Sequence, residues 1–151
     1  MFFTIGFLHL LFSIISMITG LIVILNTKGT KFHKKVCNVY VVNMLLLNIS
    51  SFFISNFNGF SIFHFFAIVS LITILAGMYP VLKRSENWLQ KHYYFMAWSV
   101  VGLYCAFWSE VGTRFVKNMQ YFWWAVAIAT FLTAFLGFYF IKKNAKKLTE
   151  Q

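Results

Sequence analysis

Long apolar runs separated by short polar stretches dominate the chain. Five such runs follow one another, over roughly residues 2–25, 36–54, 60–82, 93–111 and 121–141. Each is close to the ~20 residues that an α-helix needs to cross the hydrocarbon core of a bilayer. The pattern therefore predicts an all-α fold, a polytopic membrane helical bundle with five transmembrane helices and short connections.

The sequence predicts a single transmembrane domain over residues 1–151, because no repeat, low-complexity stretch or long linker divides it. A four-helix core would cover about 2–113, a fifth helix about 119–141, and a basic cytoplasmic tail 142–151. The first run lacks the basic start and the small-x-small cleavage site of a signal peptide, so we expect it to be retained as a span.

Composition excludes the soluble enzyme folds. Hydrophobic residues make up 60% of the chain, with 13 Lys and Arg against 3 Asp and Glu, whereas soluble domains carry about a quarter charged residues. Eleven of the 13 basic residues fall in alternate connections and the tail: Lys28, Lys31, Lys34, Lys35, Lys83, Arg84, Lys91, Lys142, Lys143, Lys146 and Lys147. Cytoplasmic loops attract such residues. This distribution predicts an outside N-terminus and a cytoplasmic C-terminus, and it explains the positive charge without a nucleic-acid partner.

The four histidines fall one on each of the first four predicted helices. Ionisable groups inside a membrane are costly, which makes them candidates for function. Because alternate helices run in opposite directions, His9 and His64 are expected near the outer face, and His33 and His92 near the inner face. The stretch from His9 to Leu25 would separate the two levels by roughly 24 Å.

Helical periodicity places other residues on the histidine faces. These stripes contain His9, Ser13, Ser16 and Gly20; His33, Cys37, Tyr40, Met44 and Ser51; His64, Ile68, Leu71, Leu75 and Met78; and His92, Met96, Ser99 and Glu110. Small residues let bulky partners approach a helix closely. The stripes of the first, second and fourth runs are therefore suited to packing against another helix or a flat cofactor.

Two kinds of cofactor suit such histidine pairs. Two neutral imidazoles can take both axial positions of a heme iron, so His9 with His64 and His33 with His92 would hold two hemes b. Alternatively, His9, His64 and Glu110 could bind zinc, which takes nitrogen and oxygen ligands. In a third interpretation the histidines only pack and form hydrogen bonds, and the protein is a membrane scaffold or accessory subunit. Cys37 and Cys105 are expected to be small core residues.

Two motifs carry a resemblance to a bacterial membrane family, the domain of unknown function 2306. Members have a His-Arg-x-x-Gly-x-x-Tyr-Val motif opening one span and a His-Arg-x-x-Met motif opening a later one. The matching positions here are His33, Tyr40, Val41, His92 and Met96, whereas Lys34, Cys37 and Tyr93 depart from the motifs. The motifs lie within residues 9–114 and leave the fifth run outside. The resemblance implies a bacterial cytoplasmic (inner) membrane protein.

The order of the histidines also resembles, more distantly, the ascorbate-reducible diheme cytochromes b. There, alternate helices share each heme, which implies ligation by His9 with His64 and by His33 with His92. A protein of this kind would be a transmembrane oxidoreductase that passes electrons between a small donor and an acceptor such as a quinone. The sequence is compatible with a monomer or an oligomer in the lipid bilayer.

Overall fold

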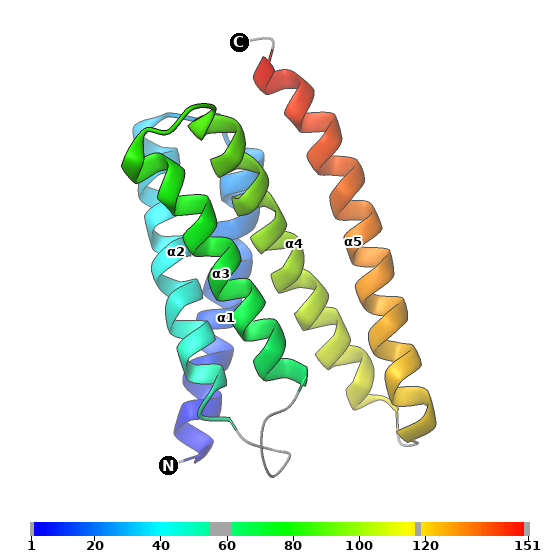
Figure 1. Ribbon diagram of the computed structural model, residues 1–151. Coiled ribbons are helices and arrows are strands. Elements are labelled where there is room, and N and C mark those ends of the chain that lie inside the picture. The colour runs from blue at the N-terminus through cyan, green and yellow to red at the C-terminus, as the bar shows by residue number, and fades with distance from the viewer. Residues whose placement is uncertain (1, 55–61, 117–118, 150–151) are drawn as a thin grey trace. The chain divides into compact units, whose positions relative to one another are not determined.

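The computed structural model describes residues 2–54, 62–116 and 119–149 (Figure 1). The elements within these residues are α1 (Phe2–Leu25), α2 (Lys31–Ser51), α3 (Ile62–Lys83), α4 (Trp88–Arg114) and α5 (Met119–Thr149). Each predicted apolar run forms a helix, and the described residues contain no strand. The all-α prediction and the order of five helices are thus confirmed. The predicted connection at residues 55–59 lies outside the described residues.

Three of the described helices are long and apolar enough to cross a membrane. They contain the segments Thr4–Leu25, Phe63–Lys83 and Gln120–Ala145. Helices α2 and α4 have sufficient length, but asparagines in α2 and a basic, amide-bearing start in α4 interrupt their apolar character. The chain therefore contains membrane-spanning helices, while the count of five spans and their orientation stay predictions.

Helices α2, α4 and α5 extend beyond their apolar runs, and α4 does so by beginning at Trp88. Helix α2 begins at Lys31 because the side chain of Thr30 caps it, accepting a hydrogen bond of 3.0 Å from the His33 backbone N–H. Helix α5 continues through the predicted basic tail to Thr149. Lys, Ala and Leu in that tail are strong helix formers, so the helix continues where the apolar run stops.

Contacts divide the chain into two compact units, Met1–Ile74 and Leu75–Gln151. In the first unit, α1 and α2 lie side by side and run in opposite directions (Figure 1). The N-terminal part of α3 joins them through a hydrogen bond of 3.2 Å from Asn48 Nδ2 to Ser70 Oγ. The turn after α1 is closed by the Lys28 ammonium, which donates to the carbonyls of Val23, Ile24 and Asn26.

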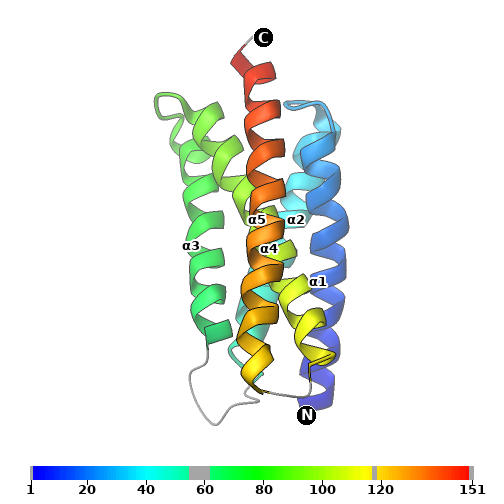
Figure 2. The same ribbon diagram turned by 90° about the vertical axis from the view of Figure 1, so that its right-hand side faces the viewer.

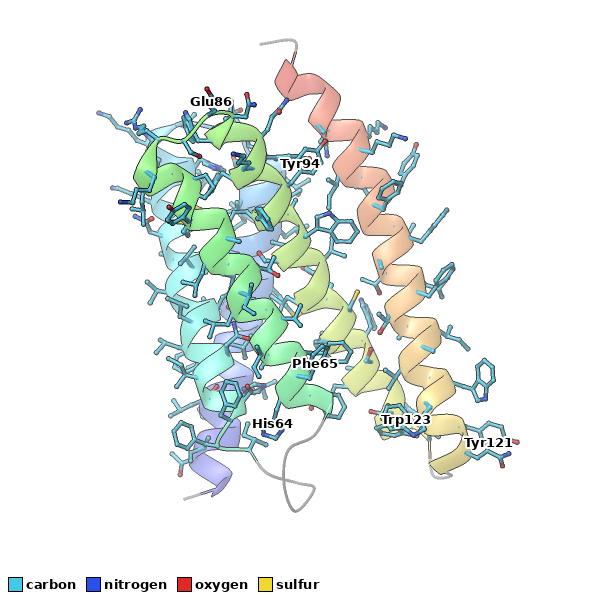
Figure 3. All side chains as sticks on the ribbon, viewed as in Figure 1. His64, Phe65, Glu86, Tyr94, Tyr121 and Trp123 are labelled. Atoms are coloured by element: carbon cyan, nitrogen blue, oxygen red, sulfur yellow. The ribbon has the colours of Figure 1, made fainter. Side chains whose placement is uncertain are left out.

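The second unit contains the C-terminal part of α3 with α4 and α5, and α4 and α5 again pack antiparallel (Figure 2). Its core consists of Tyr93, Ala97 and Val101 of α4 and Ile141 of α5. The Tyr93 hydroxyl donates to the Ile141 carbonyl over 3.1 Å. Figure 3 shows Tyr94 where α4 begins, and Tyr121 and Trp123 at the opposite end, where α5 begins. Such aromatic residues at both ends are typical of membrane boundaries.

Candidate functional site

His9 lies half-buried on α1 and reaches the last turn of α2. Its Nδ1 atom lies 2.9 Å from Ser50 Oγ. The Ser50 hydroxyl itself donates to the Leu47 carbonyl over 2.9 Å. Because the Ser50 hydroxyl can both donate and accept, the His9–Ser50 bond is compatible with either neutral tautomer of the imidazole.

His64 lies at the start of α3, where Figure 3 shows it. The imidazole is buried and packs against the ring of Phe52 at a centroid distance of 5.9 Å and an interplanar angle of 36°. Phe52 follows α2 directly, two residues after Ser50. The structure thus brings His9 and His64 to the same end of the first unit, against the C-terminal end of α2. Whether they share one ligand stays a prediction.

His33 occupies the other end of the first unit. It is the third residue of α2 and is buried on the face that also buries Cys37, Tyr40 and Met44. Ser50 lies 17 residues after His33 in continuous helix, which corresponds to a rise of about 26 Å. Within this unit, His33 therefore lies at one end of α2, and His9 and His64 lie at the other.

His92 belongs to the second unit and contacts α3. Its Nδ1 atom lies 2.9 Å from the Gly77 carbonyl oxygen, and because a carbonyl can only accept, this imidazole donates from Nδ1. Pro80 lies three residues after Gly77, within α3. A proline weakens the hydrogen bonding of the preceding helical turn, and side chains of neighbouring helices commonly satisfy the carbonyls that it releases. The carbonyl that Pro80 leaves without its helical N–H partner is that of Ala76, one residue before the Gly77 carbonyl to which His92 donates.

Gly77 permits the close approach of α3 and α4 that the His92 bond requires. A Cβ atom at Gly77 would lie 3.0 Å from Met96 Sδ and 3.1 Å from Phe95 Cβ. The sequence analysis placed Met96 on the histidine stripe, and the structure buries it there. The predicted partner of His92, His33, belongs to the other unit, and their pairing stays a prediction.

The His92 imidazole therefore has its proton on Nδ1. A neutral imidazole with Nδ1–H carries its lone pair on Nε2. Metal-binding histidines in proteins commonly have this arrangement, in which a backbone carbonyl or a side-chain oxygen accepts from the other ring nitrogen and fixes the tautomer. The geometry of His92 is thus compatible with ligation through Nε2.

The α1 stripe contains a hydroxyl that its surroundings do not satisfy. Ser16 is completely buried, and its Oγ has no hydrogen-bond partner among the residues that the structure describes. It shares the face of His9 and Gly20, as the periodicity predicts. Buried polar groups are normally hydrogen-bonded, and exceptions often mark a bound water or ligand. The surroundings of His9 are consequently compatible with an additional bound group.

On α3 and α4, the predicted histidine stripes do not match the buried face of the helix along their whole length. On α3 the buried residues are His64, Ala67, Ile74, Gly77 and Pro80, whereas Leu75 is exposed. On α4 Glu110 is exposed and Ser109 is buried in its place. The cause lies in the packing of α4 on α5, because the Ser109 hydroxyl pairs with Thr130 Oγ1 at 3.1 Å and the Cys105 thiol donates to the Thr130 carbonyl at 3.6 Å.

The zinc alternative gains no support from this geometry. Across residues 2–54, 62–116 and 119–149 no three His, Cys, Asp or Glu side chains form a group suited to a metal ion. Glu110 belongs to the second unit, while His9 and His64 belong to the first. The set of His9, His64 and Glu110 stays a prediction.

Sequence reasoning missed the groups that hold the imidazoles. Ser50 was not assigned to the His9 site, and Gly77 was not assigned to any site. The only signal for Ser50 was its place in a polar cluster at the end of an apolar run, and for Gly77 its position three residues before the single proline. Neither feature of the sequence indicates that the partner is a histidine.

A family model described as "Predicted membrane protein (DUF2306)" matches residues 6–142. The match includes the fifth helix, which the motif resemblance had left outside, and this corrects its extent. No curated protein and no solved structure matches the chain. Since the family model covers nearly the whole chain, the protein belongs to the DUF2306 family of predicted membrane proteins.

Proposed function

We propose that this membrane protein transfers electrons across the bilayer through two hemes b. His9 and His64 would ligate one heme near the outer face, and His33 and His92 the other near the inner face. All five helices would cross the membrane, with the N-terminus outside and the C-terminus in the cytoplasm. A small reductant on one side would supply electrons to a quinone or another acceptor on the other.

The tautomer of His92 carries this proposal. Its ring donates from Nδ1 to the Gly77 carbonyl over 2.9 Å. This bond orients the ring and places the lone pair on Nε2, which a heme iron accepts from an axial histidine. In the other proposed pair, the bond of 2.9 Å between His9 Nδ1 and Ser50 Oγ orients the His9 ring.

The surroundings of the outer pair favour a flat apolar group. His64 is buried beside the Phe52 ring. Ser16 and Gly20 are small, buried residues on the His9 face of α1, and small residues allow close approach. Heme iron supplies one-electron chemistry by changing between its ferrous and ferric states. The chain would orient the imidazoles and exclude water, which are the contributions a protein makes to such a centre.

Helix α2 supports transfer across the membrane, because it separates the two histidine levels. His33 and the Ser50 contact of His9 are about 26 Å apart along the helix, which is most of the ~30 Å hydrocarbon thickness. An electron path between the two faces requires such a separation, with a centre at each end.

The absorption spectrum of protein purified from heme-sufficient cells tests the proposal. We expect a Soret band and a sharp reduced α band, both lost when His9→Ala and His33→Ala are combined, since each change removes a ligand of a different heme. Lys91→Ala, an exposed change beside His92, serves as the control and should retain the spectrum. Colourless wild-type protein from such cells would contradict the proposal, and stoichiometric zinc in that protein would favour the alternative metal site.

A further inference from the structure

We propose that the start of α2 is a docking surface for anionic phospholipid headgroups at the membrane boundary. The docking surface consists of the exposed side chains of Lys31, Phe32, Lys34 and Lys35, which flank the buried His33 in the first two turns of the helix. The chemistry that it would recognise is a negatively charged phosphate joined to an apolar tail. Binding of this kind is independent of heme, because it involves the lysines and not the histidines.

The first unit has an unbalanced charge. Residues 1–74 contain four lysines, no arginine and no aspartate or glutamate. All four lysines fall within residues 28–35. One of them, Lys28, lies at the C-terminal end of α1, where its ammonium donates to three backbone carbonyls. The three lysines of the docking surface have no acidic residue in their own unit, so their counter-ions must come from outside it.

The position of these lysines in α2 increases the need for an anion. The N-terminal end of a helix carries a partial positive charge, which stabilises anions and disfavours cations. Lys34 and Lys35 follow Lys31 by three and four residues, a spacing at which like charges are neighbours on the helix surface and repel. The first turn of α2 contains no acidic residue. The lysines therefore destabilise the start of the helix unless an anion lies beside them.

The location of the docking surface favours a lipid over a soluble anion. Helix α1 contains the segment Thr4–Leu25, which is long and apolar enough to cross a membrane, and Lys31 follows its last residue by only six positions. We therefore expect the start of α2 at the level of the headgroups, where basic residues attract anionic lipids. Phe32 is 55% exposed beside the lysines. A lipid offers this ring an apolar partner, whereas inorganic phosphate does not.

Two triple variants with the same change in net charge separate the docking surface from the overall charge. Glutamine removes the charge of lysine and is also a strong helix former. The docking variant combines Lys31→Gln, Lys34→Gln and Lys35→Gln. The control variant combines Lys83→Gln, Lys142→Gln and Lys143→Gln. The control lysines are exposed and lie in the C-terminal parts of α3 and α5, where the helix dipole does not oppose a cation.

Thermal unfolding of the full chain in uncharged detergent tests the cost of the lysines. Without lipid, we expect the docking variant to have a higher Tm than wild type, because the repulsion at the start of α2 is removed, and the control variant to show no such increase. A docking variant that is no more stable than wild type in lipid-free detergent would contradict the unfavourable placement of the lysines.

Phosphatidylglycerol added to the same micelles tests the lipid. We expect it to raise the Tm of wild type, of the control variant and of a variant with arginine at the three lysine positions, but not that of the docking variant. Each basic residue near an anionic membrane surface strengthens binding about fivefold, so the docking variant should bind this lipid roughly 100-fold more weakly than wild type. An equal rise in Tm in wild type and the docking variant would overturn the proposal.

Two further titrations of wild type identify the source of the phosphate. Phosphatidylcholine has a phosphate and a tail but no net charge, and inorganic phosphate has the charge but no tail. We expect neither to raise the Tm as phosphatidylglycerol does. If inorganic phosphate alone reproduces the rise, the surface binds a free anion and the assignment to lipid is wrong.

Discussion

Replacing Gly137 with alanine will loosen the packing of α5 on α4 and lower the stability of the second unit. A Cβ atom there would lie 2.4 Å from Val101 Cγ2 and 2.6 Å from Val101 Cγ1, well inside van der Waals contact. Val101 belongs to the core of this unit and is β-branched, which restricts its escape to another rotamer. Overpacking of this kind costs about 1–3 kcal/mol, measurable by SDS titration in mixed micelles.

A double-mutant cycle identifies the cause. Val101→Ala removes both methyl groups that the new Cβ would meet, so Gly137→Ala combined with Val101→Ala should be less unstable than the sum of the two single changes. Gly102→Ala, next to Val101 on α4, meets no atom within 4 Å and should leave stability nearly unchanged. If Gly137→Ala is as harmless as Gly102→Ala, the close contact between α4 and α5 is incorrect.

Replacing Gly77 with alanine will disturb His92 without changing any group that bonds to it. The new Cβ would lie 3.1 Å from Phe95 Cβ, which is fixed to the backbone of α4. The helices must therefore move apart, and the bond of 2.9 Å between His92 Nδ1 and the Gly77 carbonyl will lengthen. We expect the free energy of unfolding to fall by about 1–3 kcal/mol. We also expect the Nδ1 signal of His92 to change in the ¹⁵N NMR spectrum of histidine-labelled protein in detergent.

The effect of Gly77→Ala should be confined to the second unit. His9 and its partner Ser50 lie in the first unit, so the imidazole signals of His9 serve as an internal reference. Gly102→Ala again provides the control, since α4 gains a methyl group there without meeting a neighbour. A His92 signal that is identical in wild type and Gly77→Ala would show that the Gly77 carbonyl does not hold this ring.

The helices could be predicted from the sequence because the bilayer sets their length. A run of about 20 apolar residues has few alternatives to a helix where backbone groups must be satisfied internally. The buried face of α2 could also be predicted, since His33, Cys37, Tyr40 and Met44 follow the helical period over their whole length. The ends of α2 and α5 could not, because capping by Thr30 and the helical tail lie outside the apolar signal.

Contacts between helices could not be predicted from periodicity. Glu110 has the same helical phase as His92, but the C-terminal half of α4 turns Cys105 and Ser109 toward α5, and Glu110 is exposed. Likewise, the partners of His9 and His92 depend on the relative height of neighbouring helices, which a single sequence does not encode locally. Periodicity describes one helix, whereas these sites depend on pairs.

The number of hemes bound by paired histidine variants tests the central claim most directly. His9→Ala combined with His64→Ala removes both ligands of one proposed centre, so this protein should retain one heme per chain, half of the wild-type value. His9→Ala combined with His33→Ala removes one ligand from each centre and should retain none. Equal heme content in the two double variants, or a wild type that binds no heme at all, would contradict the account.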